Sequence, residues 1–115
     1  ATAPVRLYYT GWSSSTGEAD WGLRPLFAGD KTPPSMYNIS YYKNPTVDAD
    51  IMKALGTTDR AEKTKLYTEV QEEIWKDAPW AFLVTEKLLY ATSKKLTGMY
   101  VMPDANYFFE EIDLQ

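Results

Sequence analysis

The residues of this sequence that are best suited to chemistry stand in one stretch, 11–21, which reads Gly-Trp-Ser-Ser-Ser-Thr-Gly-Glu-Ala-Asp-Trp. Its indole rings offer stacking faces, its hydroxyls can donate or accept hydrogen bonds, and its carboxylates can pair with a cation. Binding residues concentrate in polar loops held by rigid elements. We therefore predict that this loop helps to hold a small polar molecule, with six candidate ligand-binding residues: Trp12, Ser14, Ser15, Thr16, Glu18 and Asp20.

Each candidate also has an ordinary structural role. Glu18 and Asp20 could form the acid pair of a glycosidase, but facing catalytic carboxylates normally come from separate elements, so a helix N-cap or a ligand hydrogen bond is favoured. Asp20 could cap a helix that begins at Trp21, or pair with Arg24 one turn later. Tryptophans beside regular elements usually pack into a core, and a serine run also suits a plain linker.

The composition excludes several classes of function. The 115 residues include neither cysteine nor histidine, so disulfides, thiolate or imidazole metal sites and the commonest general base are unavailable. We therefore expect no enzyme, no catalytic residue, no cofactor and no metal site. The net charge of -4, with both signs interspersed, disfavours nucleic acid and acidic membranes as partners.

The first third of the chain predicts mostly short elements. Residues 5–10 alternate between apolar and polar types and predict a strand that ends at Gly11. Residues 21–28 suit a short helix in which Pro25 either lies in the first turn or breaks the helix. Residues 29–42 have no clear period and predict an irregular excursion, whose Asn38, Tyr41 and Tyr42 either line a cleft or lie at the surface.

Two amphipathic helices follow. The first is predicted to begin with Asn44 as N-cap and Pro45 in the first turn and to end at Gly56, with its buried face formed by Val47, Ile51 and Leu55. The second is predicted to begin at Asp59, with Glu62 completing a capping box, and to end before Pro79. Its buried stripe is predicted to contain Leu66, Tyr67, Val70, Ile74 and Trp75.

The remaining segments predict the layer that covers these helices. Residues 80–85 and 88–91 are apolar runs of strand length joined by a tight turn at 86–87, and short extended pieces are expected at 99–102 and 107–112. The sequence therefore predicts a mixed α and β architecture, described as α+β or α/β, in which helices pack on a small mixed sheet.

The order of motifs resembles a known family. Leu-Tyr-Tyr-Thr-Gly-Trp at 7–12 precedes the polar loop, Tyr-Lys-Asn-Pro-x-x-Asp at 42–48 opens a helix, and Asp-Ala-Pro-Trp stands at 77–80. This order is similar to the C-terminal portion of the peptide-binding branch (family 5) of the bacterial solute-binding proteins of ABC importers. The motifs at 11–21 and 87–98 most resemble receptors for glutathione.

The resemblance implies that the 115 residues are one C-terminal segment of a longer, two-lobed extracytoplasmic protein. They would form part of the second lobe, with the last residues returning towards the N-terminal lobe. The implied location is the periplasm, and the implied partners are a small peptide, the inner-membrane permease and the missing N-terminal lobe. Because apolar surface that faced the missing parts must be exposed or re-covered, we also expect the chain to self-associate.

One departure from the family bears on the ligand. By an ungapped count from Gly11-Trp12, Ser15 stands where peptide receptors of the branch typically carry an aspartate for the peptide's α-ammonium. A buried ammonium without a counter-charge is costly, so the resemblance implies glutathione or a similar small peptide, with Glu18 or Asp20 taking over the ammonium. A carbohydrate-binding or glycoside-hydrolase domain is the alternative, and a protein-interaction module is a third.

Overall fold

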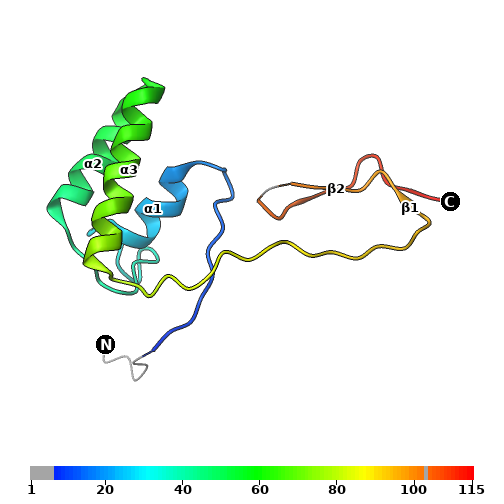
Figure 1. Cartoon of the computed structure of the whole chain (residues 1–115), viewed down its shortest axis with the longest axis horizontal. Helices are drawn as coiled ribbons and strands as arrows, with labels where there is room; N and C mark the ends of the chain where they lie inside the picture. Colours follow the sequence, from blue (N-terminus) through cyan, green and yellow to red (C-terminus); the bar gives the residue numbers. More distant parts are fainter. Residues whose placement is uncertain (1–6, 103) are drawn as a thin grey trace.

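The computed structural model describes residues 7–102 and 104–115. Three helices form one unit, and four very short strands lie at the other end of a long extended segment (Figure 1). The radius of gyration is 18.1 Å, whereas a compact domain of this length has about 13 Å. The described chain therefore does not gather around a single core.

The predicted strand 5–10 is wrong for residues 7–10, the part of it that the structure describes. Its first two residues lie outside the described part of the chain, and residues 7–10 have no strand pairing with the described residues. The side chains of Leu7, Tyr8 and Tyr9 are exposed. A strand needs a hydrogen-bonded neighbour, and no other described segment lies in position to supply one.

The first helix, α1, spans Ala19–Phe27. The prediction of a helix here is confirmed, but Pro25 lies near its C-terminal end rather than in the first turn. The N-cap is Glu18, whose side chain makes no capping hydrogen bond, so the suggestion that Asp20 caps the helix is wrong. Asp20 lies inside the first turn and is engaged elsewhere.

The second helix, α2, spans Pro45–Gly56, and its predicted start is confirmed. The Asn44 side-chain oxygen accepts hydrogen bonds from the backbone N–H groups of Thr46 at 2.9 Å and Val47 at 3.4 Å. The buried face runs through Val47, Ile51 and Ala54. Leu55 was predicted on that face but is exposed, since it lies about 100° around the helix from Ala54.

The third helix, α3, spans Arg60–Asp77 with Asp59 as its N-cap, as predicted. The reciprocal capping-box bond is not formed. Glu62 instead accepts a hydrogen bond from the Thr57 hydroxyl at 3.0 Å, and the Thr57 hydroxyl oxygen accepts from the Asp59 N–H at 3.2 Å. The Thr57 hydroxyl therefore bridges the Asp59 N–H and the Glu62 carboxylate, which a capping box would join directly.

The buried stripe of α3 is confirmed except at its end. Leu66, Tyr67, Val70 and Ile74 are buried, but the Trp75 side chain is 69% exposed and stacks on Phe82 with ring centroids 5.7 Å apart. The helix ends as predicted before Pro79, at Ala78 in the left-handed conformation.

Among the residues that the structure describes, the hydrophobic core lies within the three helices and their connections. α2 packs along α3, and α1 lies across both. One cluster joins the end of α1 to both longer helices, and a smaller cluster lies further along them. The buried members are Leu26, Phe27, Ala28, Val47, Ile51, Val70 and Ile74 in the first cluster, and Ala54, Leu66 and Tyr67 in the second.

Asn38 closes the excursion between α1 and α2. Its side chain is fully buried, and its amide nitrogen donates to the backbone oxygens of Ala28 at 3.0 Å and Tyr42 at 2.8 Å. Its oxygen accepts from the Tyr42 N–H at 3.1 Å and the Ser40 hydroxyl at 3.0 Å. Both roles left open for Asn38 are therefore wrong: its side chain neither lines a cleft nor lies at the surface, but is a buried brace inside the excursion.

The predicted strands 80–85 and 88–91 are wrong. Residues 81–93 run as an extended segment without strand pairing to any described residue. The strands that do form are β1 (Leu96–Thr97), β2 (Tyr100–Val101), β3 (Tyr107–Phe108) and β4 (Asp113–Leu114). β1 pairs with β4 and β2 with β3, both antiparallel. The extended pieces expected at 99–102 and 107–112 thus each contain one strand.

Gly98 makes the turn from β1 towards β2 possible. Its φ is +74°, and a Cβ added there would lie 1.8 Å from the backbone oxygen of Glu111. Only glycine fits such a backbone conformation and such a close approach.

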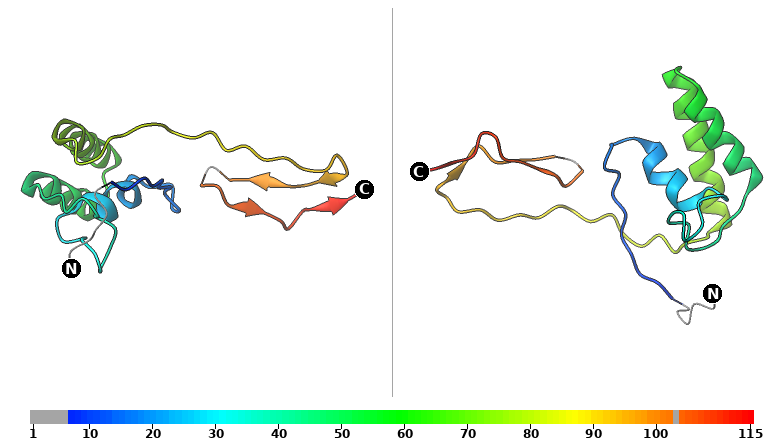
Figure 2. Two further views of the ribbon diagram at one scale, coloured as in Figure 1. Left: turned by 90° about the horizontal axis from the view of Figure 1, so that it is seen from below. Right: turned by 180° about the vertical axis from the view of Figure 1, so that it is seen from behind.

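The structure is of the mixed α and β class, as predicted, but the predicted packing of helices on a mixed sheet is wrong. In the described residues no helix contacts a strand, and the two small sheets are antiparallel (Figure 2). The apolar runs at 80–91 lack the neighbouring strands that would turn them into such a sheet.

We predict that Asn38→Ala destabilises the helical unit by about 1–3 kcal/mol, because it leaves buried backbone groups at Ala28 and Tyr42 without partners. Urea unfolding followed by tryptophan fluorescence would measure the change. Ser35→Ala, which removes an exposed hydroxyl that donates to the Thr32 carbonyl, is the control and should have little effect. Equal stability of Asn38→Ala and the wild-type chain would contradict the brace.

A second prediction concerns pH. The Asp77 carboxylate accepts hydrogen bonds from the Tyr42 hydroxyl at 2.6 Å and the Asn44 amide at 2.8 Å, joining the start of α2 to the end of α3. These bonds lower the pKa of Asp77, while burial and the same bond raise the pKa of Tyr42 to about 12. Because the pKa of Asp77 is depressed on folding, its contribution to stability is present at neutral pH and is lost as pH falls through the folded value.

We therefore expect the wild-type chain to lose stability between about pH 5 and pH 3 more steeply than Tyr42→Phe, which lacks the stronger of the two donors. Unfolding midpoints in urea across this range would measure the two slopes. Identical slopes would show that the Tyr42–Asp77 bond does not contribute to stability.

Candidate functional site

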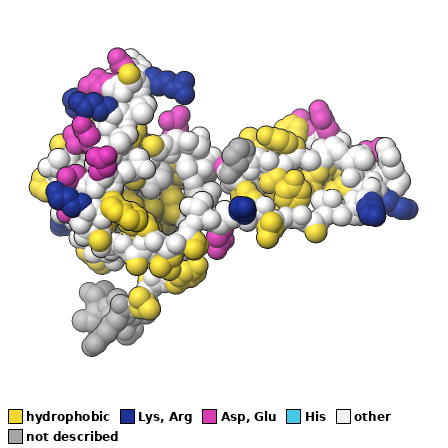
Figure 3. Space-filling model, in the orientation of Figure 1, with side chains coloured by type: hydrophobic (Ala, Val, Ile, Leu, Met, Phe, Trp, Pro, Cys, Tyr) yellow, Lys and Arg dark blue, Asp and Glu magenta, His cyan; other side chains and the backbone are white. Residues whose placement is uncertain are grey.

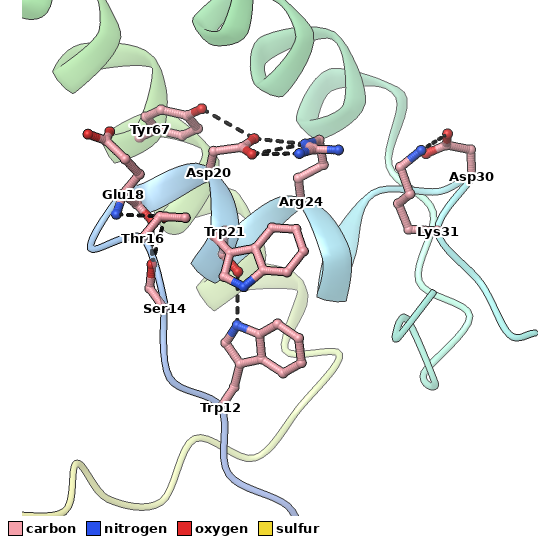
Figure 4. Close-up of polar contacts among 10 residues, drawn as sticks. All are labelled: Trp12, Ser14, Thr16, Glu18, Asp20, Trp21, Arg24, Asp30, Lys31 and Tyr67. Atoms are coloured by element: carbon pink, nitrogen blue, oxygen red, sulfur yellow. Dashed lines mark hydrogen bonds and ion pairs between the residues drawn. The ribbon is translucent and has the colours of Figure 1, made fainter. Parts of the chain in front are cut away.

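The polar loop is attached to α1 through the backbone carbonyl of Trp21, which has no helical hydrogen-bond donor because residue 25 is proline. In an α-helix the N–H of residue 25 would bond to the carbonyl of residue 21, but Pro25 has no N–H. The Trp21 carbonyl instead accepts a hydrogen bond from the Trp12 indole N–H at 2.8 Å (Figure 4). Pro25 and Trp12 together therefore fix where the loop meets the helix.

Aromatic packing reinforces this attachment. The Trp12 ring lies 5.1 Å from the Tyr37 ring and 6.2 Å from the Trp21 ring, measured between centroids. About a third of Trp12 remains exposed, at 36%. Trp12 thus packs partly against the protein and still offers surface to a ligand. Tyr37, 53% exposed, was not predicted as part of this cluster, because it lies in an excursion without a sequence period.

Residues 14–18 form a tight turn that satisfies most of its own polar groups. The Ser14 hydroxyl donates to the Glu18 carbonyl at 2.9 Å, and the Thr16 hydroxyl oxygen accepts from the Glu18 N–H at 3.2 Å. Gly17, with φ +69°, donates its N–H to the Ser14 carbonyl at 3.3 Å. Ser14 and Thr16 therefore shape the turn that leads into α1.

Asp20 is held by α1 and α3 and does not point into the loop. Its carboxylate accepts three hydrogen bonds from the Arg24 guanidinium, at 2.8 to 3.0 Å, and lies 3.5 Å from the Tyr67 hydroxyl. This is the intrahelical ion pair that the spacing predicted. The bond from Asp20 raises the pKa of Arg24, and burial together with the charge of Asp20 raises the pKa of Tyr67 to about 12.

The six candidates therefore do not converge on one point within this chain. Trp12 lies against Trp21, Ser14 and Thr16 are engaged within the turn, and Asp20 faces Arg24 and Tyr67 (Figure 4). The side chains of Ser15 and Glu18 are exposed, and no hydrogen bond or ion pair joins either to another described residue. Of the six candidates, these two are the ones whose side chains are both exposed and without a hydrogen bond among the described residues.

Other surface features lie away from this loop. An open hollow on α3 is lined by Thr68, Gln71, Glu72 and Trp75, and a second lies between the end of the extended segment and the strands. Across the described ranges, no cluster of three or more carboxylates could hold a metal ion. The helices in these ranges are too short or too polar to cross a membrane.

No protein-family model matches the chain. Along nearly its whole length, however, the chain is similar to proteins of known name. It is 62% identical over 110 residues to the glutathione-binding protein GsiB of Pectobacterium atrosepticum. It is 54% identical over 111 residues to the proteins of the same name from Escherichia coli K12 and Salmonella typhimurium.

These matches cover 96% of the chain but only 21–22% of each relative, so the chain spans about a fifth of the length of the curated relatives it matches. The resemblance inferred from the motifs is confirmed: the chain is similar to a segment of the glutathione-binding proteins.

Proposed function

We propose that the chain is part of the extracytoplasmic solute-binding component of an ABC importer, which captures glutathione or a similar small peptide and delivers it to a membrane permease. The observation that carries this proposal is the 62% identity to a glutathione-binding relative along 96% of the chain. The relatives are named as binding proteins, so the proposal includes no catalytic step.

The polar loop is proposed as a contact surface for the ligand. Glutathione carries an ammonium, two carboxylates and two amides, so its partners need both hydrogen-bond donors and a negative charge. Glu18 supplies the carboxylate for the ammonium, and the Ser15 hydroxyl bonds an amide or a carboxylate. The exposed part of Trp12 packs against the peptide chain. Asp20 is less suited to this task because Arg24 already neutralises it.

The chain supplies one wall of the proposed site. Effective small-molecule sites enclose most of the ligand surface, whereas the loop described here is open to solvent. The rest of the polypeptide is proposed to provide the opposite wall, and this proposal is supported by the relatives, of which the chain spans about a fifth. Closure of the two walls around the ligand is the proposed mechanism, with the ligand favouring the closed state because it contacts both.

We predict that Glu18→Ala in the complete polypeptide weakens glutathione binding about tenfold or more, or about 1.4 kcal/mol, because the ligand ammonium loses its counter-charge. Ser15→Ala should weaken it less. Calorimetry would measure both affinities. Glu72→Ala removes an exposed carboxylate on α3 and serves as the charge-matched control. If Glu18→Ala and Ser15→Ala each bind within about threefold of the wild type, the loop is not the anchor.

A further prediction tests how the loop is held. Trp12→Phe retains an aromatic ring but removes the N–H that bonds to the Trp21 carbonyl. We expect weaker glutathione binding by the complete polypeptide, with the helical content unchanged by circular dichroism. Pro25→Ala restores a helical N–H that competes for the same carbonyl, so it should weaken binding in the same direction. Unchanged affinity in both variants would contradict the role assigned to this bond.

A further inference from the structure

The ion pair between Asp20 and Arg24 is built entirely from contacts within α1. The Arg24 Nε donates to both carboxylate oxygens of Asp20, at 2.9 and 3.0 Å, and Nη2 donates to one of them at 2.8 Å. Only 17% of the Asp20 side chain and 26% of the Arg24 side chain are exposed. Because the two residues stand one helical turn apart, the pair needs no segment beyond this helix.

Tyr67 fixes the opposite side of Asp20. Its hydroxyl lies 3.5 Å from the Asp20 carboxylate, and its side chain belongs to the smaller buried cluster along α2 and α3. Figure 4 shows the Asp20 carboxylate between the Tyr67 hydroxyl and the Arg24 guanidinium. Asp20 therefore holds Arg24 from a position that the helical core itself determines.

The charge of Glu18 is not neutralised within the described chain. Glu18 precedes Asp20 by two residues, and no ion pair joins it to another described residue, whereas Asp20 and Arg24 neutralise each other. Both carboxylates lie near Tyr67: burial raises the pKa of the Tyr67 hydroxyl to about 12, and the charges of Asp20 and Glu18 contribute to this rise. On the face drawn in Figure 3, acidic and basic side chains lie interspersed over the helical unit, so no patch of one sign outweighs this local negative charge.

Removing the Asp20 carboxylate would change this arrangement in a definite direction. A half-buried guanidinium that loses its carboxylate is an uncompensated charge, which is costly until it finds another anion. Asp30, whose charge also acts on Arg24, is already paired with Lys31, whereas Glu18 has no such partner among the described residues. A freed Arg24 would therefore compete with a ligand ammonium for Glu18, and its positive charge would repel that ammonium even without direct contact.

We propose that Asp20 is a positioning residue that determines ligand specificity: it holds Arg24 away from Glu18, so that the Glu18 carboxylate stays available for the single ammonium of the ligand. Asp20 does not touch the ligand and acts only through Arg24. The inference rests on the proposed function, because it takes from there the contact between Glu18 and the ammonium. The substrate class that follows is a small peptide with one ammonium, selected over the same molecule without it.

The test compares glutathione with an analogue in which hydrogen replaces the ammonium. Calorimetry on the complete polypeptide gives the Kd of each, and the ratio of the two values is the ammonium selectivity. We expect the wild type to prefer glutathione about tenfold or more, and both Asp20→Asn and Asp20→Ala to reduce this preference about fivefold or more. Because both ligands are measured on the same variant, a smaller folded fraction cancels in the ratio.

Three further variants separate charge neutralisation from helix stability. Asp20→Glu keeps the carboxylate and should keep most of the selectivity. Asp20→Asn combined with Arg24→Gln removes both charges and should restore the selectivity to within about twofold of the wild type, although it removes more native contacts than the single variant. Glu69→Gln, which breaks an ion pair of the same spacing with Lys65 on α3, is the matched control and should leave the selectivity unchanged.

The inference is overturned if Asp20→Asn and Asp20→Ala keep the wild-type selectivity, including the case in which both ligands bind more weakly in parallel. It is also overturned if the combined variant loses as much selectivity as Asp20→Asn alone. These outcomes leave the proposed function intact, provided that the wild type prefers glutathione. A wild type that binds glutathione and the analogue equally would instead contradict the role of Glu18, and with it both proposals.

Discussion

The burial of apolar side chains between α2 and α3 is the constraint on which the rest of the described structure depends. Every buried residue in the described ranges 7–102 and 104–115 lies between Pro25 and Ile74, within the three helices and their connections. The hydrophobic contribution is proportional to the apolar area removed from water, so this unit supplies most of the folding free energy. Two segments outside this unit differ in how they are held. The polar loop 11–21 is attached to it, and the extended segment 81–93 leaves it without strand pairing to any described residue.

The polar loop is held in place by its contacts with the helical unit. It has no core of its own, and its position relative to α1 is set by one indole hydrogen bond, aromatic packing and the turn at 14–18. This arrangement leaves Ser15 and Glu18 exposed beside a rigid helix, where the proposed ligand contact would place them. The extended segment 81–93 has no such attachment, because its backbone is not paired with any described residue and most of its apolar side chains are exposed.

The sequence-based predictions were correct for features that depend on residues close in the sequence and wrong for features that depend on distant ones. The caps at Asn44 and Asp59 were predictable because each depends on a hydrogen bond to a backbone N–H two or three residues away. The strands expected at 80–91 were not, because a strand exists only with a neighbour that composition does not reveal. Leu55 and Trp75 show the intermediate case, in which periodicity identifies a buried face but not its edges. For the candidate loop, the sequence indicated the right ion pair at Asp20, whereas the bond between Trp12 and the carbonyl freed by Pro25 required knowing that Pro25 lies inside the helix.

Native-state hydrogen exchange on the chain at low concentration tests this central claim most directly. Backbone amides in α2 and α3 should be protected to the same degree, since they unfold together, while those of residues 81–92 should exchange at nearly the rate of an unfolded peptide. Strong protection of residues 81–92 in a monomeric chain would mean that their backbone amides are hydrogen-bonded within the chain. The account of a single helical core would then be wrong.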